Sequence, residues 1–213
     1  MPNARSCSDW RLYVILDPRA AAGRDLARIA ELAIRGGADA LQLRDKHGTA
    51  RDALDQARRI LAAARPSGVP LLINDRVDLA IAAEADGVHL GQDDLPVKEA
   101  RRIIGPEALI GVSTHNLEQV RQAVLDGASY LGVGPTFPSG TKAFSAVSGL
   151  EFVRQALAVT SLPAFVIGGV NLENVGAAVA AGARRIAVSQ ALCQVEDPRI
   201  QAAALRNALL TNP

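Results

Sequence analysis

The sequence is poor in cysteine, in aromatic residues and in long apolar runs. Its 213 residues include only Cys7 and Cys193, too few for a disulfide framework or a cysteine metal cluster. No apolar run approaches the roughly 18 residues that a membrane-spanning helix needs. The opening MPNARSCSDW also lacks the apolar core of a signal peptide. We therefore expect a protein of the reducing cytoplasm that is not inserted in a membrane.

An excess of charge of either sign is absent as well. The chain has 23 Lys and Arg against 22 Asp and Glu, a formal net charge of +1. This balance gives no electrostatic reason to expect binding to nucleic acid or to a membrane surface. What the chain does contain is apolar residues, at 49% of the total, which is enough to build a full core in a single domain.

Short strand-like runs alternate with amphipathic helix-like runs along the whole chain. This order predicts parallel strands joined by helical crossovers, with Asn116 and Asn171 as helix N-caps. The predicted strands cover residues 12–17, 40–45, 70–75, 87–91, 109–113, 130–134, 164–169 and 185–189. The predicted helices cover residues 24–37, 52–64, 95–105, 116–127, 150–159 and 171–182.

A weak internal repeat indicates that the strands form a set of eight. The segments GADALQL, EADGVHL, GASYLGV and GARRIAV each lead from a small-residue turn into a strand. Their matching alanines are 47, 43 and 55 residues apart, enough for two strand–helix units each. We predict an α/β fold, a single-domain (β/α)8 TIM barrel over residues 12–213 after an N-terminal extension of residues 1–11. A doubly wound open sheet is the structural alternative.

The second predicted strand, ALQLRDK, changes from apolar to polar along its length. Strand side chains alternate between two faces, so Gln42, Arg44 and Lys46 share one face while Leu41 and Leu43 share the other. The leucines are expected to face the helices. Active sites of this barrel lie at the carboxyl ends of the strands. We therefore expect Gln42, Arg44 and Lys46 at the mouth of the barrel, as part of a binding site.

Acidic residues follow the third and fourth predicted strands. The third ends in Asn74 and Asp75, and the fourth leads into Asp93 and Asp94. Neighbouring strands lie about 5 Å apart, so two carboxylates at their ends repel unless a cation lies between them. Mg²⁺ prefers a few protein carboxylates together with substrate phosphates. The alternative is that Asn74 or Asp75 only caps the next helix.

Two further segments have the residues expected of phosphate-binding sites. The long loop GPTFPSGTKAFSAVSG after the sixth strand offers Ser139, Thr141 and Lys142. The seventh and eighth strands end in VIGGVN and AVSQAL, where Gly168 and Gly169 permit close backbone approach and Ser189 is expected to start a short extra helix. Two anion-binding patches beside a cationic strand and two acids favour two phosphorylated small molecules. They point to transfer of a group from a diphosphate, with stabilisation of the departing pyrophosphate.

From about Leu12 to the last helix, the chain resembles the thiamine phosphate synthases. The resemblance rests on seven motifs in order along the chain: QLRDK, IND, HLGQDD, GVS, GPTFPSGTK, IGGV and VSQAL. It implies an enzyme that joins 4-amino-2-methyl-5-hydroxymethylpyrimidine diphosphate to a thiazole phosphate. The products are thiamine phosphate and pyrophosphate, with CO₂ when the thiazole is carboxylated. The implied mechanism is dissociative and assisted by Mg²⁺.

The resemblance also implies a role for each matching residue. Arg44, Ser113 and Lys142 are the implied catalytic residues. The residues implied to bind the pyrimidine diphosphate are Gln42, Arg44, Lys46, Asn74, Ser113 and Lys142. Those implied to bind the thiazole phosphate are Ser139, Thr141, Gly169, Val188 and Ser189. The implied ligands of Mg²⁺ are Asp75 and Asp94.

Two other functions remain open at this point. The thiazole tautomerases share the barrel but need acid–base chemistry, and His115, just after GVS, is their kind of residue. A non-catalytic phosphate-binding barrel would keep the pocket without turnover. The sequence leaves the role of His115, the thiazole form and a possible homo-oligomer undecided.

Overall fold

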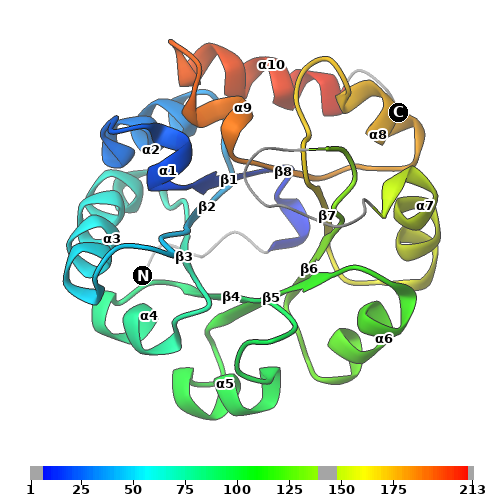
Figure 1. Cartoon of the computed structure of the whole chain (residues 1–213), viewed down its shortest axis with the longest axis horizontal. Helices are drawn as coiled ribbons and strands as arrows, with labels where there is room; N and C mark the ends of the chain where they lie inside the picture. The colour runs from blue at the N-terminus through cyan, green and yellow to red at the C-terminus, as the bar shows by residue number, and fades with distance from the viewer. Residues whose placement is uncertain (1–6, 139–147, 211–213) are drawn as a thin grey trace.

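Eight parallel strands form a closed barrel in sequential order, with β8 paired to β1 (Figure 1). The computed structural model describes residues 7–138 and 148–210. The closed barrel confirms the predicted fold and excludes the open sheet. The strands are β1 Leu12–Leu16, β2 Ala40–Leu43, β3 Leu71–Asn74, β4 Gly87–Leu90, β5 Leu109–Thr114, β6 Tyr130–Val133, β7 Ala164–Ile167 and β8 Ile186–Val188.

Helices surround the barrel on its outside (Figure 1). They are α1 Pro18–Ala21, α2 Leu26–Arg35, α3 Ala50–Ala64, α4 Val77–Ala83, α5 Val97–Ile104, α6 Leu117–Leu125, α7 Gly149–Val159, α8 Val175–Ala180, α9 Gln190–Cys193 and α10 Pro198–Leu210. Two short 3-10 helices, η1 Cys7–Asp9 and η2 Arg65–Ser67, complete the described elements. Among the described helices, none has the length and apolarity required to cross a membrane.

The predicted N-caps were right at one position and wrong at the other. Asn116 caps α6, because its Oδ1 accepts a hydrogen bond from the backbone N–H of Gln119. Helix α8 begins later than predicted, and its N-cap is Asn174. The Oδ1 of Asn171 instead accepts from the N–H groups of Glu173 and Asn174, which stabilises a turn before the helix. The local turn therefore uses the capping chemistry that the sequence assigned to the helix.

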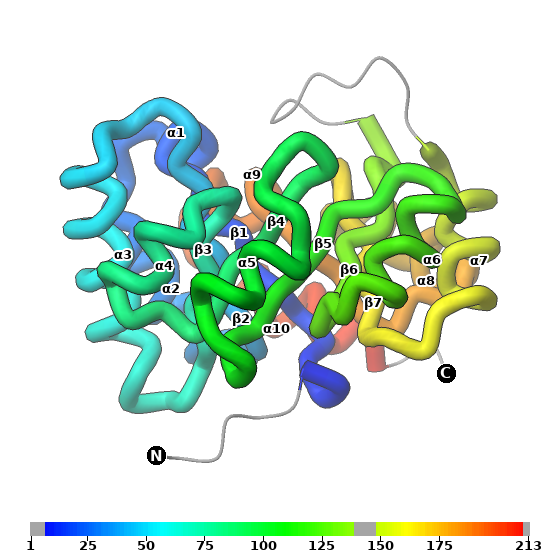
Figure 2. The backbone as a smooth tube through the Cα atoms, turned by 90° about the horizontal axis from the view of Figure 1, so that it is seen from below, coloured from blue at the N-terminus to red at the C-terminus, as the bar shows by residue number. Residues whose placement is uncertain are grey.

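Two apolar layers stabilise the barrel. Side chains such as Leu41 and Leu43 point outward and pack with the helices in one continuous core, as the alternation in β2 predicts. The layer inside the barrel is aromatic and contains Trp10, Tyr130 and Phe165. Trp10 follows η1, which lies at the lower end of the barrel in Figure 2, opposite to α1 and α9. The lower end is therefore filled by side chains, and the open end lies at the carboxyl ends of the strands.

Asp39 ties three parts of the chain together at the lower end. Its Oδ2 accepts hydrogen bonds from the backbone N–H groups of Arg11 and Leu12, at 2.8 and 3.1 Å. The same oxygen forms an ion pair with Arg206 of α10 at 2.5 Å, and the Asp39 side chain is only 5% exposed. Asp39 thus joins the start of β1, the start of β2 and the last helix.

Replacing Asp39 by Asn is expected to lower the free energy of unfolding by about 2 kcal/mol. The change leaves Arg206 without its charged partner and weakens the hydrogen bonds to the start of β1. Urea denaturation followed by circular dichroism measures the effect. Glu99→Gln is the matched control, because the exposed pair with Arg102 contributes about 0.5 kcal/mol or less. Equal stability of the two variants would contradict this role for Asp39.

Candidate active site

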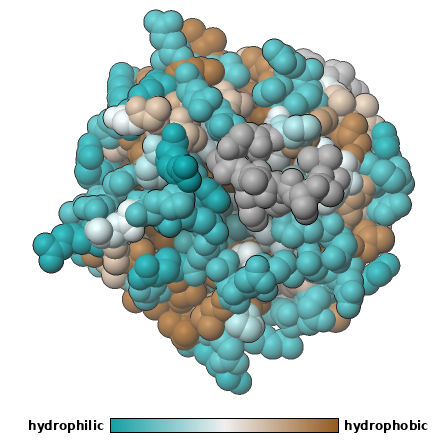
Figure 3. Space-filling view, in the orientation of Figure 1, coloured by the Kyte–Doolittle hydropathy of each residue, from teal (hydrophilic) through white to brown (hydrophobic). Residues whose placement is uncertain are grey.

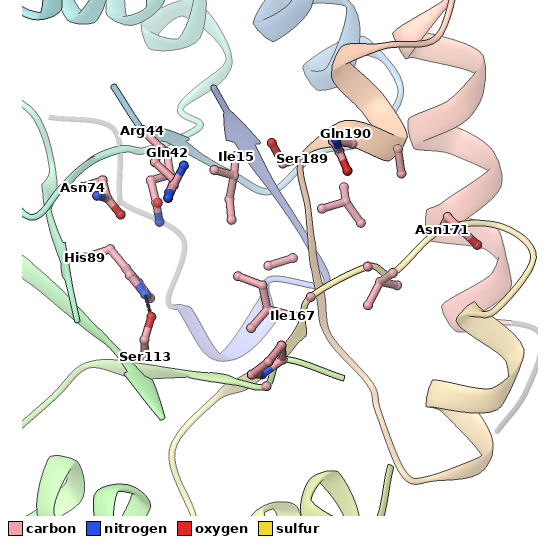
Figure 4. Close-up of a pocket in the computed structure, with 18 of the residues that line it drawn as sticks. Ile15, Gln42, Arg44, Asn74, His89, Ser113, Ile167, Asn171, Ser189 and Gln190 are labelled. Atoms are coloured by element: carbon pink, nitrogen blue, oxygen red, sulfur yellow. Dashed lines mark hydrogen bonds between the residues drawn. The ribbon is translucent and has the colours of Figure 1, made fainter. Parts of the chain in front are cut away.

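A pocket with a volume of about 560 Å³ opens at the carboxyl ends of the strands. Ile15, Gln42, His89, Ser113 and Ile167, each from a different strand, converge on it in Figure 4. In Figure 3, hydrophilic residues lie to the left of and below the centre of this face. The residues expected from the sequence that line this pocket are Gln42, Arg44, Lys46, Asn74, Asp75, Asp94, Ser113, Gly169, Val188 and Ser189. The other three, Ser139, Thr141 and Lys142, lie outside the described residues.

Arg44 is held in place by a buried carboxylate that the sequence did not reveal as a site residue. The Nη1 of Arg44 lies 2.6 Å from the Oδ2 of Asp17, whose side chain is 5% exposed. The Oδ1 of Asp17 caps α1 by accepting from the N–H groups of Arg19 and Ala20. One carboxylate therefore fixes both a helix start and a guanidinium at the pocket. Its position directly after β1, before a proline at the first turn of α1, is the signal that could have identified it.

The two expected carboxylates lie together beside Lys46. The Nζ of Lys46 is 3.0 Å from the Oδ2 of Asp75, and the backbone N–H of Gly91 donates to the Oδ2 of Asp94 at 2.6 Å. Burial, followed by the hydrogen bond and the charge of Asp75, raises the pKa of Asp94. Asp75 therefore disfavours the ionised form of Asp94.

The backbone at Asp75 is in the left-handed region, with φ of +61°. This conformation is uncommon for residues other than glycine, and Asp and Asn tolerate it best. Asp75 does not cap α4, whose N-cap is Arg76. The strained conformation aims a carboxylate at the pocket and not at the helix, as active sites often do.

These acids fit a magnesium ion that is shared with a substrate. Within the described ranges, no cluster of three or more His, Cys, Asp or Glu side chains forms a complete protein metal site. Mg²⁺ is usually bound through one or two carboxylates plus substrate phosphates and water. Asp75 and Asp94, whose repulsion a cation would relieve, provide this donor set.

Gly169 and Ser189 line another part of the pocket. Gly169 has φ of +66°, and a Cβ there would lie 2.4 Å from the carbonyl oxygen of Pro138. Ser189 is the residue before α9, as expected, and its buried Oγ has no hydrogen-bond partner among the described residues. Unpaired buried hydroxyls are rare, so this atom indicates a ligand partner. The Cys193 thiol lies near Ser189 but donates to the carbonyl oxygen of Ile15.

His115 lines the pocket and is hydrogen-bonded to the backbone of the segment that follows β6. Its Nδ1–H donates to the carbonyl oxygen of Gly134 at 2.6 Å, and its own N–H donates to Gln119 Oε1 at 2.7 Å. The carbonyl oxygen of His115 also accepts from Ser148 Oγ. Both flanks of the segment 139–147 are therefore joined to His115, which gives this residue a structural task.

Known proteins similar to this chain agree in their names. Residues 12–192 match the family described as thiamine monophosphate synthase. The chain is 47% identical to the thiamine-phosphate synthase of Chloroflexus aurantiacus, over 93% of this chain and 92% of that protein. It is 40% identical to the thiamine-phosphate synthase of Shouchella clausii, over 94% of this chain and 96% of that protein.

A solved structure agrees with these relatives. Thiamine phosphate pyrophosphorylase from Pyrococcus furiosus superposes with a TM-score of 0.87 at 33% identity, over 98% of both chains. The sequence match and the structural match cover the same barrel and the strand ends that form the pocket. The chain therefore belongs to the thiamine monophosphate synthase family.

Proposed function

We propose that the protein joins 4-amino-2-methyl-5-hydroxymethylpyrimidine diphosphate to a thiazole phosphate, releasing pyrophosphate. The observation that carries the proposal is the pairing of a cationic wall, Arg44 and Lys46, with two carboxylates in the same pocket as Gly169 and Ser189. The two cations and the two carboxylates, which could share a metal ion, suit a diphosphate. Gly169 and Ser189 suit a phosphate monoester.

The chain's own residues would bind the diphosphate and prepare its departure. Arg44, fixed by Asp17, offers a planar fork of donors that matches phosphate oxygens. Lys46 would exchange its contact with Asp75 for the diphosphate. Lys142, expected from the sequence alone, would meet negative charge as it builds on the leaving group. Asn74 would orient the same substrate from the end of β3.

Asp75 and Asp94 would hold Mg²⁺, which supplies charge neutralisation for the departing pyrophosphate when bound. Departure leaves an electron-poor methylene carbon on the pyrimidine. Ser113, at the pocket end of β5, would lie near this ring. The thiazole nitrogen would then attack the carbon, forming the new C–N bond.

The thiazole phosphate would bind on the other side of the pocket. The free Oγ of Ser189 and the backbone at Gly169 and Val188 would receive the monophosphate. Ser139 and Thr141 would contact the carboxylate or neighbouring groups of the thiazole. Separate positions for the two substrates place the attacking nitrogen and the reacting carbon in one cavity.

The test is turnover by the purified protein with the pyrimidine diphosphate, the thiazole phosphate and Mg²⁺. Thiamine phosphate and pyrophosphate are expected in equal amounts, EDTA is expected to abolish their formation, and Mg²⁺ or Mn²⁺ in excess is expected to restore it. Chromatography of both products measures the result. Full turnover in EDTA would refute the metal role. Binding of both substrates without turnover would identify a non-catalytic barrel, and turnover of the thiazole alone, by isomerisation, a tautomerase.

A further inference from the structure

A continuous chain of hydrogen bonds crosses the barrel beneath the pocket. The Nε2 of Gln42 donates to Tyr13 Oη at 2.6 Å, and Tyr13 Oη lies 2.8 Å from Tyr130 Oη. Tyr130 Oη lies 2.9 Å from His89 Nδ1, and His89 Nε2 lies 2.9 Å from Ser113 Oγ. Figure 4 marks the last contact as a dashed line. The chain begins and ends at residues that line the pocket.

The orientation of the Gln42 amide, whose Nε2 faces Tyr13 Oη, gives this series of hydrogen bonds one direction. Tyr13 and Tyr130 are 1% and 0% exposed, so their hydroxyl protons need a protein acceptor. Because Tyr13 accepts from Gln42, its proton goes to Tyr130. The Tyr130 proton then goes to His89 Nδ1, which must be unprotonated. With this orientation of the Gln42 amide, His89 carries its proton on Nε2 and donates it to Ser113 Oγ.

The two ends of the chain consequently present opposite hydrogen-bonding groups. Ser113 accepts from His89, so its own proton is available to an acceptor in the pocket. Gln42 directs one N–H of its amide to Tyr13, so its Oε1 is available to a donor. If the donor and acceptor roles were exchanged at one end, they would be exchanged in every hydrogen bond of the series and at the other end.

We propose that His89 and Tyr130 are positioning residues that fix this polarity and thereby select the aminopyrimidine ring, an inference that rests on the proposed function. A 4-aminopyrimidine offers an amino donor and ring-nitrogen acceptors, which match Gln42 Oε1 and the Ser113 hydroxyl. The corresponding 4-oxopyrimidine offers a carbonyl acceptor and a ring N–H donor. Its carbonyl would face Gln42 Oε1, which is also an acceptor, and its ring N–H would find only the remaining lone pair of Ser113 Oγ. Sites built on buried polar partners reject such mismatches strongly.

The aromatic packing around the chain supports this role. Tyr130 contacts Tyr13, Phe165 and Trp10 at ring-centroid distances of 5.6, 5.5 and 5.9 Å. A Cβ at residue 111 would lie 2.1 Å from Cζ of Tyr130, so Gly111 leaves the space that this ring occupies. The hydroxyl groups therefore have little freedom to turn, and Tyr130→Phe removes one oxygen while keeping the ring.

The experiment compares kcat/KM for the 4-amino substrate and for its 4-oxo analogue in the wild type and in Tyr130→Phe. The ratio of the two values is expected to fall at least about tenfold in the variant, because Ser113 and Gln42 can then change polarity independently. The intrinsic reactivity of each ring cancels in this comparison. Trp10→Phe is the matched control, since Trp10 packs on Tyr130 but takes no part in the series of hydrogen bonds. Its ratio of kcat/KM for the 4-amino substrate to kcat/KM for the 4-oxo analogue is expected to stay within about threefold of the wild-type ratio.

Nitrogen-15 NMR of the histidine-labelled wild type gives a readout that does not depend on turnover. His89 is expected to show a protonated Nε2 and an unprotonated Nδ1. His89→Gln is expected to keep most of the selectivity, because its amide can donate to Ser113, whereas His89→Ala is expected to lose it. An Nδ1–H tautomer, or an unchanged ratio in Tyr130→Phe with an active wild type, would overturn the inference. A wild type that turns over neither ring would overturn the proposed function instead.

Discussion

Asp75→Asn is expected to reduce kcat/KM at a fixed Mg²⁺ concentration by about 10³-fold, equivalent to ~4 kcal/mol. The amide is neutral and is a weaker ligand for a hard cation, so Asp94 alone would bind the metal. Asn tolerates the left-handed backbone of this position nearly as well as Asp does, so the loss would not arise from a changed turn. Steady-state kinetics over a range of Mg²⁺ concentrations measure the effect, and excess metal is expected to recover part of the activity.

The state of Asp94 strengthens this expectation. Asp75 is one of the groups that raise the pKa of Asp94, so removing the Asp75 charge lowers that pKa toward its usual value. Asp94 would then be more fully ionised in the variant, and its protonation would not explain a loss of activity. What disappears is the second charged ligand.

Asp93→Asn provides a matched control for this prediction. It makes the same chemical change at an exposed neighbour of Asp94 that does not line the pocket. Its kinetic constants are expected to remain within about threefold of the wild type, as for surface substitutions in general. Binding of Mn²⁺ in the presence of pyrophosphate, followed by electron paramagnetic resonance, should weaken in Asp75→Asn and not in Asp93→Asn. Equal Mn²⁺ affinity in both variants would remove Asp75 from the metal site.

The strand pattern predicted the barrel because each strand carries its own local signal. Residues at the carboxyl ends, such as Asn74 and Asp75, could be placed at the mouth without knowledge of any tertiary contact. Gln42 was expected at the mouth too, and it does line the pocket, but it lies deeper, at 2% exposed and bound to Tyr13. Helix α4 was not predicted, because seven residues rich in alanine and other apolar side chains show no clear polar face.

Residues whose partners are distant in sequence escaped the sequence analysis. Tyr13 and Tyr130 are 117 positions apart and carry the features of ordinary core residues. Only closure of the barrel brings them together with His89. Asp17 escaped for a related reason, since its capping bonds are local but its contact with Arg44 crosses 27 positions. Sequence reasoning thus located the groups expected to touch substrate and missed those that hold them in place.

Arg44→Ala is expected to raise the KM for the pyrimidine diphosphate by about 100-fold, near the upper range for a charge-assisted hydrogen bond. Asp17 already fixes the guanidinium in the free protein, so Arg44 binds the diphosphate before the reaction begins. Interactions of equal strength in the ground state and the transition state affect KM and leave kcat unchanged. We therefore expect kcat to remain within a few-fold. A normal KM with a greatly reduced kcat would show that Arg44 acts in the transition state.

Asp45→Ala is the control on the same segment. The Asp45 carboxylate accepts from the N–H groups of His47 and Gly48 in the turn after β2, and it does not line the pocket. Both kinetic constants are expected to stay within a few-fold. A KM increase as large as that of Arg44→Ala would assign the effect to the conformation of the turn.

Asp17→Asn makes the role of Arg44 testable from the other side of the ion pair. Asn is as good an N-cap as Asp, so α1 should keep its start while Arg44 loses its charged partner. Alone, this change is expected to raise the diphosphate KM by about tenfold, because the guanidinium must be ordered on binding. In the Arg44→Ala background, Asp17→Asn is expected to have the opposite effect on the diphosphate KM. There the Asp17 carboxylate lacks its charged partner, and Asp17→Asn removes that uncompensated negative charge and lowers the KM for the diphosphate. Kinetics of the two single variants and the double variant measure this reversal, and additive increases in KM would show that Asp17 and Arg44 act independently.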